Sequence, residues 1–135
     1  MARPHHHAYL WLGHGDILVR PGDAHRRPAH PEFRSAQVMP LECADWLLKP
    51  ASRIEATFHE PTEAADWYAG QIALHAGLFA GSYAPVPAPE ETVRALSAGA
   101  DRVGGWWVTG GRFLSLSLIA CSPHHARPDY ACPLR

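Results

Sequence analysis

The stretch "GWWVTGGRFLSLSLIAC", residues 105–121, has the pattern of two antiparallel strands joined by a tight turn. Gly110 and Gly111 can adopt the positive backbone angles that short hairpin turns require. After the turn leucine alternates with serine, and a period of two puts alternate side chains on opposite faces of a strand. We therefore predict a β-hairpin here, with Leu114, Leu116 and Leu118 on one face and Ser115 and Ser117 on the other.

Two helices are predicted before this hairpin, over residues 61–81 and 89–99. Each begins with a proline, carries acidic residues in its first turns and is followed or ended by a glycine, as the ends of helices favour. Apolar side chains recur on the longer helix at the spacing of one helical face. The residues expected on that face are Tyr68, Ile72, His75 and Phe79.

The rest of the chain completes an α+β pattern. Residues 53–60 alternate as a half-buried strand does, and residues 9–20 indicate another hairpin. A short helix is expected between Pro40 and Pro50. The order β-β-α-β-α-α-β-β predicts one α+β domain over residues 1–135, in which a mostly antiparallel sheet of about five strands packs against two or three helices. Residues 122–135 would form an extended C-terminal tail.

Charge and composition limit the possible partners. The formal net charge is −1, which provides no broad positive field for nucleic acid. No apolar run approaches the roughly 20 residues that a membrane-spanning helix needs. The N-terminus lacks the pattern of a signal peptide and the cysteines number three, so we expect a cytoplasmic protein. Eleven of twelve cationic residues are arginine, a bias typical of GC-rich bacteria such as actinobacteria.

Cysteine and histidine gather near the C-terminus. Cys121 and His124 are separated by two residues, and Cys132 follows after seven more. Zinc prefers four nitrogen or sulfur ligands in a tetrahedron, and these three residues would need a fourth ligand, for which Cys43 or His25 is available. A disulfide between the two C-terminal cysteines is an alternative. The other alternative is that Cys121 ends a buried strand as a small apolar side chain and that the histidines after it are solvated.

The N-terminal thirty residues are also rich in histidine. In an extended segment His5 and His7 point the same way. The stretch "GDILVRPGDAH", residues 15–25, loosely resembles the second metal-binding motif of cupins at four positions, with one residue fewer between proline and glycine. The matching residues are Gly15, Pro21, Gly22 and His25. The resemblance would imply a mononuclear metal site, and a polar, solvent-facing loop is the alternative.

Acid–base chemistry is a further hypothesis, with His75, His59 and Glu60 as candidate catalytic residues. His59 and Glu60 end the predicted strand that leads into the long helix, and His75 lies on that helix. If they met in a cleft, an imidazole beside a carboxylate would suit general acid–base catalysis. Otherwise His75 is a core histidine that is hydrogen-bonded to a carbonyl or carboxylate.

Trp106 and Trp107 are adjacent in a predicted strand, so their side chains take opposite faces. We expect one in the core and the other exposed, where with Arg112 it would bind a ligand or a partner. The alternative is a tryptophan that covers the edge of the sheet.

No phosphate loop, dinucleotide fingerprint, metalloprotease helix or serine-hydrolase elbow occurs in the sequence. The leading hypothesis is therefore a small cytoplasmic binding or accessory protein, with a small molecule or a protein as partner and a homodimer as the expected assembly. An acid–base or metal-dependent enzyme of bacterial specialised metabolism is the alternative. A zinc-stabilised interaction module is the second alternative, and zinc is the one cofactor that the residues suggest.

Overall fold

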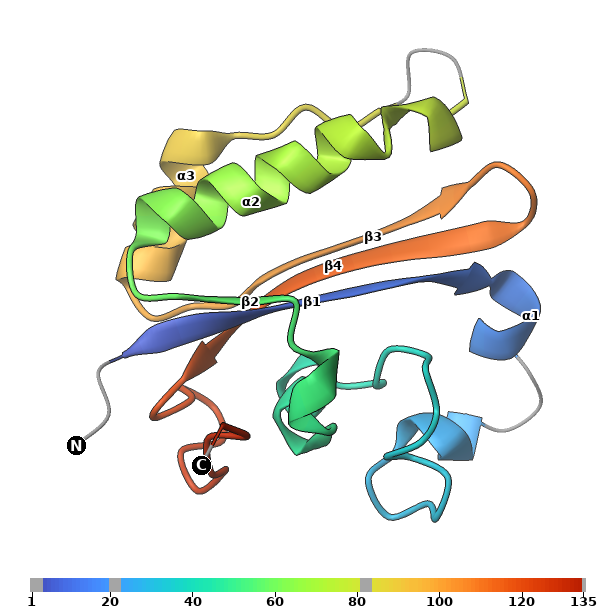
Figure 1. Cartoon of the computed structure of the whole chain (residues 1–135), viewed down its shortest axis with the longest axis horizontal. Coiled ribbons are helices and arrows are strands. Elements are labelled where there is room, and N and C mark those ends of the chain that lie inside the picture. Colours follow the sequence, from blue (N-terminus) through green and yellow to red (C-terminus); the bar gives the residue numbers. More distant parts are fainter. Residues whose placement is uncertain (1–3, 20–22, 81–83, 135) are drawn as a thin grey trace.

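The computed structural model describes residues 4–19, 23–80 and 84–134. Within these ranges the chain has an α+β fold with a four-stranded antiparallel sheet in the order β2-β1-β4-β3. The long strands β1 (His5–His14) and β4 (Arg112–Cys121) form its centre, and β2 (Ala56–Phe58) and β3 (Arg102–Val108) form its edges. Helices cover one face of the sheet and irregular segments cover the other (Figure 1).

The helical face carries α2 (Pro61–Leu74) and α3 (Pro89–Ser97), both of which begin at the predicted proline. Gly99 follows α3 with a positive φ of 83°, the conformation that ends many helices. The three leucines of β4 are completely buried under these helices, as the alternation predicted. The core on this face includes Ala8, Tyr68, Ile72, Leu96, Leu114, Leu116 and Leu118.

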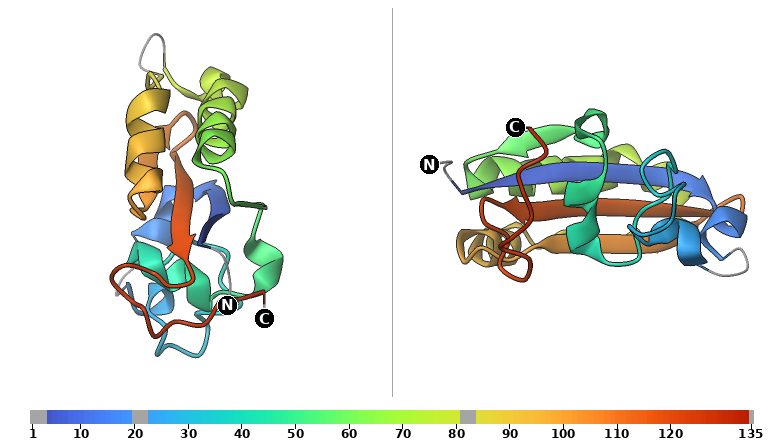
Figure 2. Two further views of the ribbon diagram at one scale, coloured as in Figure 1. Left: turned by 90° about the vertical axis from the view of Figure 1, so that its left-hand side faces the viewer. Right: turned by 90° about the horizontal axis from the view of Figure 1, so that it is seen from below.

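The opposite face of the sheet is covered by short helical turns and by the C-terminal tail. These turns are α1 (Gly15–Leu18), η1 (Asp23–Arg26), η2 (Cys43–Leu48) and η3 (Ala51–Arg53), and η4 (Ala76–Leu78) follows α2. The ring of Trp46 in η2 stacks on Tyr9 of β1, with 4.7 Å between ring centroids. Figure 2 shows the tail, in red, crossing the strands on this side. The serine face of β4 is therefore buried too.

The prediction of a first hairpin is wrong, and for this reason the sheet has four strands instead of the predicted five or so. β1 runs without a break from His5 to His14, and the chain then turns into α1 instead of a second strand. The backbone N–H of Gly15 donates to the carbonyl of Gly111, so the end of β1 is fixed to the β3–β4 turn. Its longest pairing is with β4, about a hundred residues away, and local turn chemistry cannot reveal such a distant partner.

Other predicted elements are shorter than expected. The strand predicted over residues 53–60 pairs with β1 only at Ala56–Phe58. The helix predicted over 61–81 ends at Leu74, and the one expected between Pro40 and Pro50 is the turn η2. None of the helices in the described ranges is long and apolar enough to cross a membrane.

Candidate metal centre

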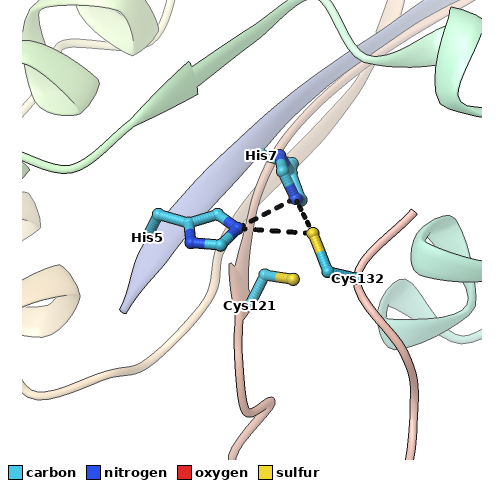
Figure 3. Close-up of side chains that lie close together, drawn as sticks. All are labelled: His5, His7, Cys121 and Cys132. Atoms are coloured by element: carbon cyan, nitrogen blue, oxygen red, sulfur yellow. Dashed lines mark hydrogen bonds between the residues drawn. The ribbon is translucent and has the colours of Figure 1, made fainter. Parts of the chain in front are cut away.

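Four buried side chains converge where β1 begins, β4 ends and the tail returns to the sheet (Figure 3). They are His5, His7, Cys121 and Cys132. Each offers one nitrogen or sulfur atom, and these atoms all lie within 4.8 Å of one another. The residues are between 0% and 8% exposed. A group of two imidazoles and two thiols is the donor set of a Cys2His2 zinc site.

The sheet itself positions three of the four residues. His5 and His7 are two residues apart on β1, so they share a face. In the β1–β4 ladder His5 lies directly opposite Cys121. Directly paired residues of antiparallel strands share a face and have Cβ atoms about 5 Å apart. Only Cys132 comes from irregular backbone, so the tail supplies the last side chain to a site that the strands have already formed.

The distances among three of the four donor atoms match those of a tetrahedral zinc site, and the Cys121 sulfur lies within 4.8 Å of each of them. The two Nε2 atoms of His5 and His7 are 3.2 Å apart. The Sγ atom of Cys132 is 3.5 Å from Nε2 of His7 and 3.7 Å from Nε2 of His5. Tetrahedral zinc with ordinary bond lengths separates two nitrogens by about 3.3 Å, and a nitrogen from a sulfur by about 3.6 Å. These three donor atoms therefore need little rearrangement to bind such an ion.

His7 is oriented from behind by a neighbouring strand. Its Nδ1 atom is 2.8 Å from the hydroxyl oxygen of Thr57 on β2, and this contact directs Nε2 toward the other three residues. A hydrogen bond of this kind, from outside the ligand set, fixes the ring of most metal-binding histidines. Burial, together with the neighbouring imidazoles, lowers the pKa of His7 to about 4, so its ring is neutral at pH 7, the form that binds metal.

Burial raises the pKa of a thiol, whereas it lowers that of an imidazole. It raises the pKa of Cys121 to about 11, with a contribution from the nearby Cys132. The thiol therefore keeps its proton at neutral pH unless a metal replaces that proton.

Two of the four predicted metal ligands, Cys121 and Cys132, belong to this group. His124 is instead placed on Asp101, with 2.9 Å between Nε2 and a carboxylate oxygen. Its Nδ1 atom accepts the backbone N–H groups of Ala126 and Arg127. Both ring nitrogens are therefore used to hold the start of the tail.

The same carboxylate holds Cys43, whose thiol donates to Asp101 across 3.5 Å. Asp101, His124 and the exposed His125 also lie close enough together to be ligands. We interpret them as a hydrogen-bonded joint, because both nitrogens of His124 already have partners. His25, the other suggested fourth ligand, donates to the carbonyl of Ile17. The cupin-like stretch falls partly on residues 20–22, which lie outside the described ranges.

A cavity of about 220 Å³ opens beside this group of four residues. His5 and Cys121 line it, and so does His59, whose ring centroid is 5.3 Å from that of His5. Cys132 and His7 are absent from its described lining. The cavity therefore borders two residues of this group, His5 and Cys121.

The predicted acid–base group is not brought together. His59 and Glu60 precede α2, and His75 follows it, so the 14-residue helix of about 21 Å separates them. His75 is half-buried rather than in the core, and its Nδ1–H donates to the carbonyl of Gln71 at 2.7 Å. His59 alone of the three lines the cavity beside the centre.

The two tryptophans take opposite faces of β3, as the sequence indicated. Trp106 packs against the helical core, with Phe79 in edge-to-face contact. Trp107 is 57% exposed and rests edge-on against Phe113. The guanidinium of Arg112 donates to the carbonyl of Thr109 across the hairpin turn. Of the two tryptophans, Trp107 is thus the one whose side chain is exposed to a partner.

Comparison of the chain with protein-family models, with curated proteins and with solved structures found no match.

Proposed function

We propose that this chain is a small binding protein, a zinc-stabilised interaction module in which a Cys2His2 centre fastens the C-terminal tail to the sheet. The observation that carries the proposal is the convergence of four buried donor atoms within 4.8 Å, from three separate parts of the chain. Four protein ligands around zinc make a closed site, and closed sites are characteristic of structural zinc. A reducing compartment such as the cytoplasm would keep both thiols available.

The position of the centre explains what zinc would stabilise. It would join His5 and His7, near the start of the chain, to Cys132, near its end. The tail contains no helix or strand between Cys121 and residue 134, and it is held by side-chain contacts. Metal binding to such a site contributes directly to the free energy of folding, because the unfolded chain does not preform it.

The partner surface in this proposal is the outer side of β3. Trp107 and Val103 lie on the same face of this edge strand and are 57% and 45% exposed. Exposed aromatic side chains are common anchors of protein interfaces, and an edge strand offers backbone groups to a further strand. A second copy of the chain is the first partner to test.

A metal-dependent enzyme is the second candidate function, and the cavity beside the centre is the observation that favours it. His5 and Cys121 line this cavity together with His59. A catalytic role would require one of the four ligands to leave the metal, because catalytic zinc keeps a position open for water or substrate.

The proposal is tested by metal content and by chelation of the untagged protein. We expect one zinc per chain. A strong chelator should lower the melting temperature by about 10 °C or more, because a cross-link over a long loop is worth about 4 kcal/mol and each kcal/mol shifts melting by a few degrees. Chymotrypsin should then cut after Tyr130. The Cys43→Ser variant is the matched control and should keep its zinc. The proposal would be contradicted if the purified protein contained no metal and its melting temperature did not change in chelator.

A further inference from the structure

We infer that the metal centre is redox-sensitive: peroxide converts Cys121 and Cys132 to a disulfide and thereby expels the zinc ion. This inference rests on the proposed function, because it concerns the zinc-bound form of the same centre. It adds a chemical stimulus to which the centre responds and assigns a different role to each cysteine.

The two sulfur atoms are close enough to bond after a small movement. They lie within 4.8 Å of each other, and a disulfide bond is about 2.05 Å long, so closure requires a shift of less than about 3 Å. Cys121 is the last residue of β4 and is held by the sheet. Cys132 lies in irregular backbone and is followed by Pro133. The tail can therefore supply the movement while the strand stays in place.

The position of the cavity distinguishes the two cysteines of the centre. Cys121 lines the cavity of about 220 Å³, whereas Cys132 is absent from its described lining. Hydrogen peroxide, with two heavy atoms, is far smaller than this space. Because the cavity borders Cys121, we assign the first reaction with peroxide to this residue, and the attack on the oxidised sulfur to Cys132 from the side of the tail. The third cysteine, Cys43, does not belong to this pair, because its thiol is hydrogen-bonded to Asp101.

The reaction proceeds in two steps. The Cys121 thiolate attacks one peroxide oxygen, the O–O bond breaks, and the departing hydroxide takes a proton to become water. The product is a sulfenic acid at Cys121. The Cys132 thiolate then attacks this sulfur, the S–O bond breaks, and a second hydroxide leaves and becomes water. In total two thiolates, one peroxide and two protons give one disulfide and two waters, and the two sulfurs supply the two electrons.

Loss of the metal follows from the donor set. Once both thiolates are consumed, His5 and His7 are the two ligands of the group that remain, and structural zinc requires four. The tail remains attached to the end of β4 through the new disulfide, whereas the link from Cys132 to His5 and His7 through the ion is lost. A dithiol reductant reverses the reaction by thiol–disulfide exchange, after which added zinc can bind again.

The experiment treats the zinc-loaded full chain with one equivalent of hydrogen peroxide. Zinc release is followed with a chromogenic chelator, thiols are titrated after denaturation, and peptides are mapped by mass spectrometry. We expect one zinc released per chain, a fall from three thiols to one, and a disulfide that joins Cys121 to Cys132. The Cys43→Ser variant should release zinc equally and retain no thiol. Dithiothreitol and zinc should restore the starting state.

A second variant tests the separate roles. In Cys132→Ser the sulfenic acid at Cys121 has no nearby thiol, so a dimedone adduct should form at Cys121. This variant can lose zinc or stability. The peptide map of the peroxide-treated wild-type chain is therefore sufficient by itself to test whether the disulfide forms. A chain that never binds zinc would contradict the proposed function. A zinc-loaded chain that keeps its zinc and three thiols, forms a disulfide with Cys43, or is overoxidised without any disulfide would overturn the inference.

Discussion

Lys49, the only lysine in the chain, is almost completely buried and makes the pH dependence of stability predictable. Its ammonium donates to the carbonyls of Phe33 and Ala36 at 2.6 and 2.8 Å, and it lies 4.2 Å from the centre of the Phe33 ring. Burial, with a contribution from Arg53, lowers the pKa of Lys49 from 10.5 to about 8. The folded protein therefore binds the proton on Lys49 more weakly than the unfolded chain does.

The sign and size of the effect follow from this difference. Below pH 8 both states carry the proton, and the folded state bears the full cost of burying the charge. Between pH 8 and 10.5 only the unfolded chain holds the proton, so this contribution to the free energy of unfolding rises with pH. Above pH 10.5 both states are neutral. The difference between the pKa of Lys49 in the unfolded chain and its value of about 8 in the folded protein corresponds to about 3 kcal/mol of unfolding free energy.

The assay is urea unfolding of the zinc-loaded protein and of Lys49→Met at several values of pH, followed by tryptophan fluorescence. Subtraction of the two curves removes the groups that both proteins share. This matters because burial raises the pKa of Cys43 to about 11, which gives the opposite trend in the same range. Between pH 8 and 10.5 we expect the free energy of unfolding of the wild type to rise by up to about 3 kcal/mol relative to that of the variant. A difference that stays constant across this range would refute the reasoning.

Three further substitutions have distinct expected outcomes. His124→Ala should lower the free energy of unfolding by about 2–3 kcal/mol, because it removes one hydrogen bond to Asp101 and the acceptor of two backbone N–H groups, yet metal analysis should still find one zinc per chain. His75→Ala should lower the free energy of unfolding by about 1 kcal/mol in urea titrations without changing metal content, since it removes one hydrogen bond at the end of α2. Trp107→Ala should leave melting nearly unchanged but weaken self-association about tenfold or more in sedimentation experiments, and equal association would exclude β3 as the interface.

Local sequence signals predicted the elements whose partners are close in the chain. Gly110 and Gly111 define the β3–β4 hairpin by their backbone conformation alone, with φ of 78° and 67°. The proline at the start of each main helix did the same for α2 and α3. The prediction for β1 was wrong because both of its faces are buried and its principal partner is β4. Gly13 and Gly15 resemble a hairpin turn, but Gly13 lies within the strand and Gly15 begins α1.

Local sequence signals predicted only part of the candidate site, because its residues come from segments that are distant in the chain. Cys121 and Cys132 stood out through their spacing, and the parallel orientation of His5 and His7 was expected from their separation of two residues. What joins the two pairs is the register that puts His5 opposite Cys121, and a register between distant strands leaves no local pattern. His124 has suitable spacing for a ligand, but the backbone and Asp101 occupy both of its nitrogens.

The central claim is that two imidazoles and two thiolates hold one zinc ion, and X-ray absorption at the zinc edge of the purified full chain tests it most directly. The account predicts two sulfur neighbours at about 2.3 Å and two nitrogen neighbours at about 2.0–2.1 Å. A shell of nitrogen and oxygen alone, a single sulfur, or protein that takes up no zinc would contradict it.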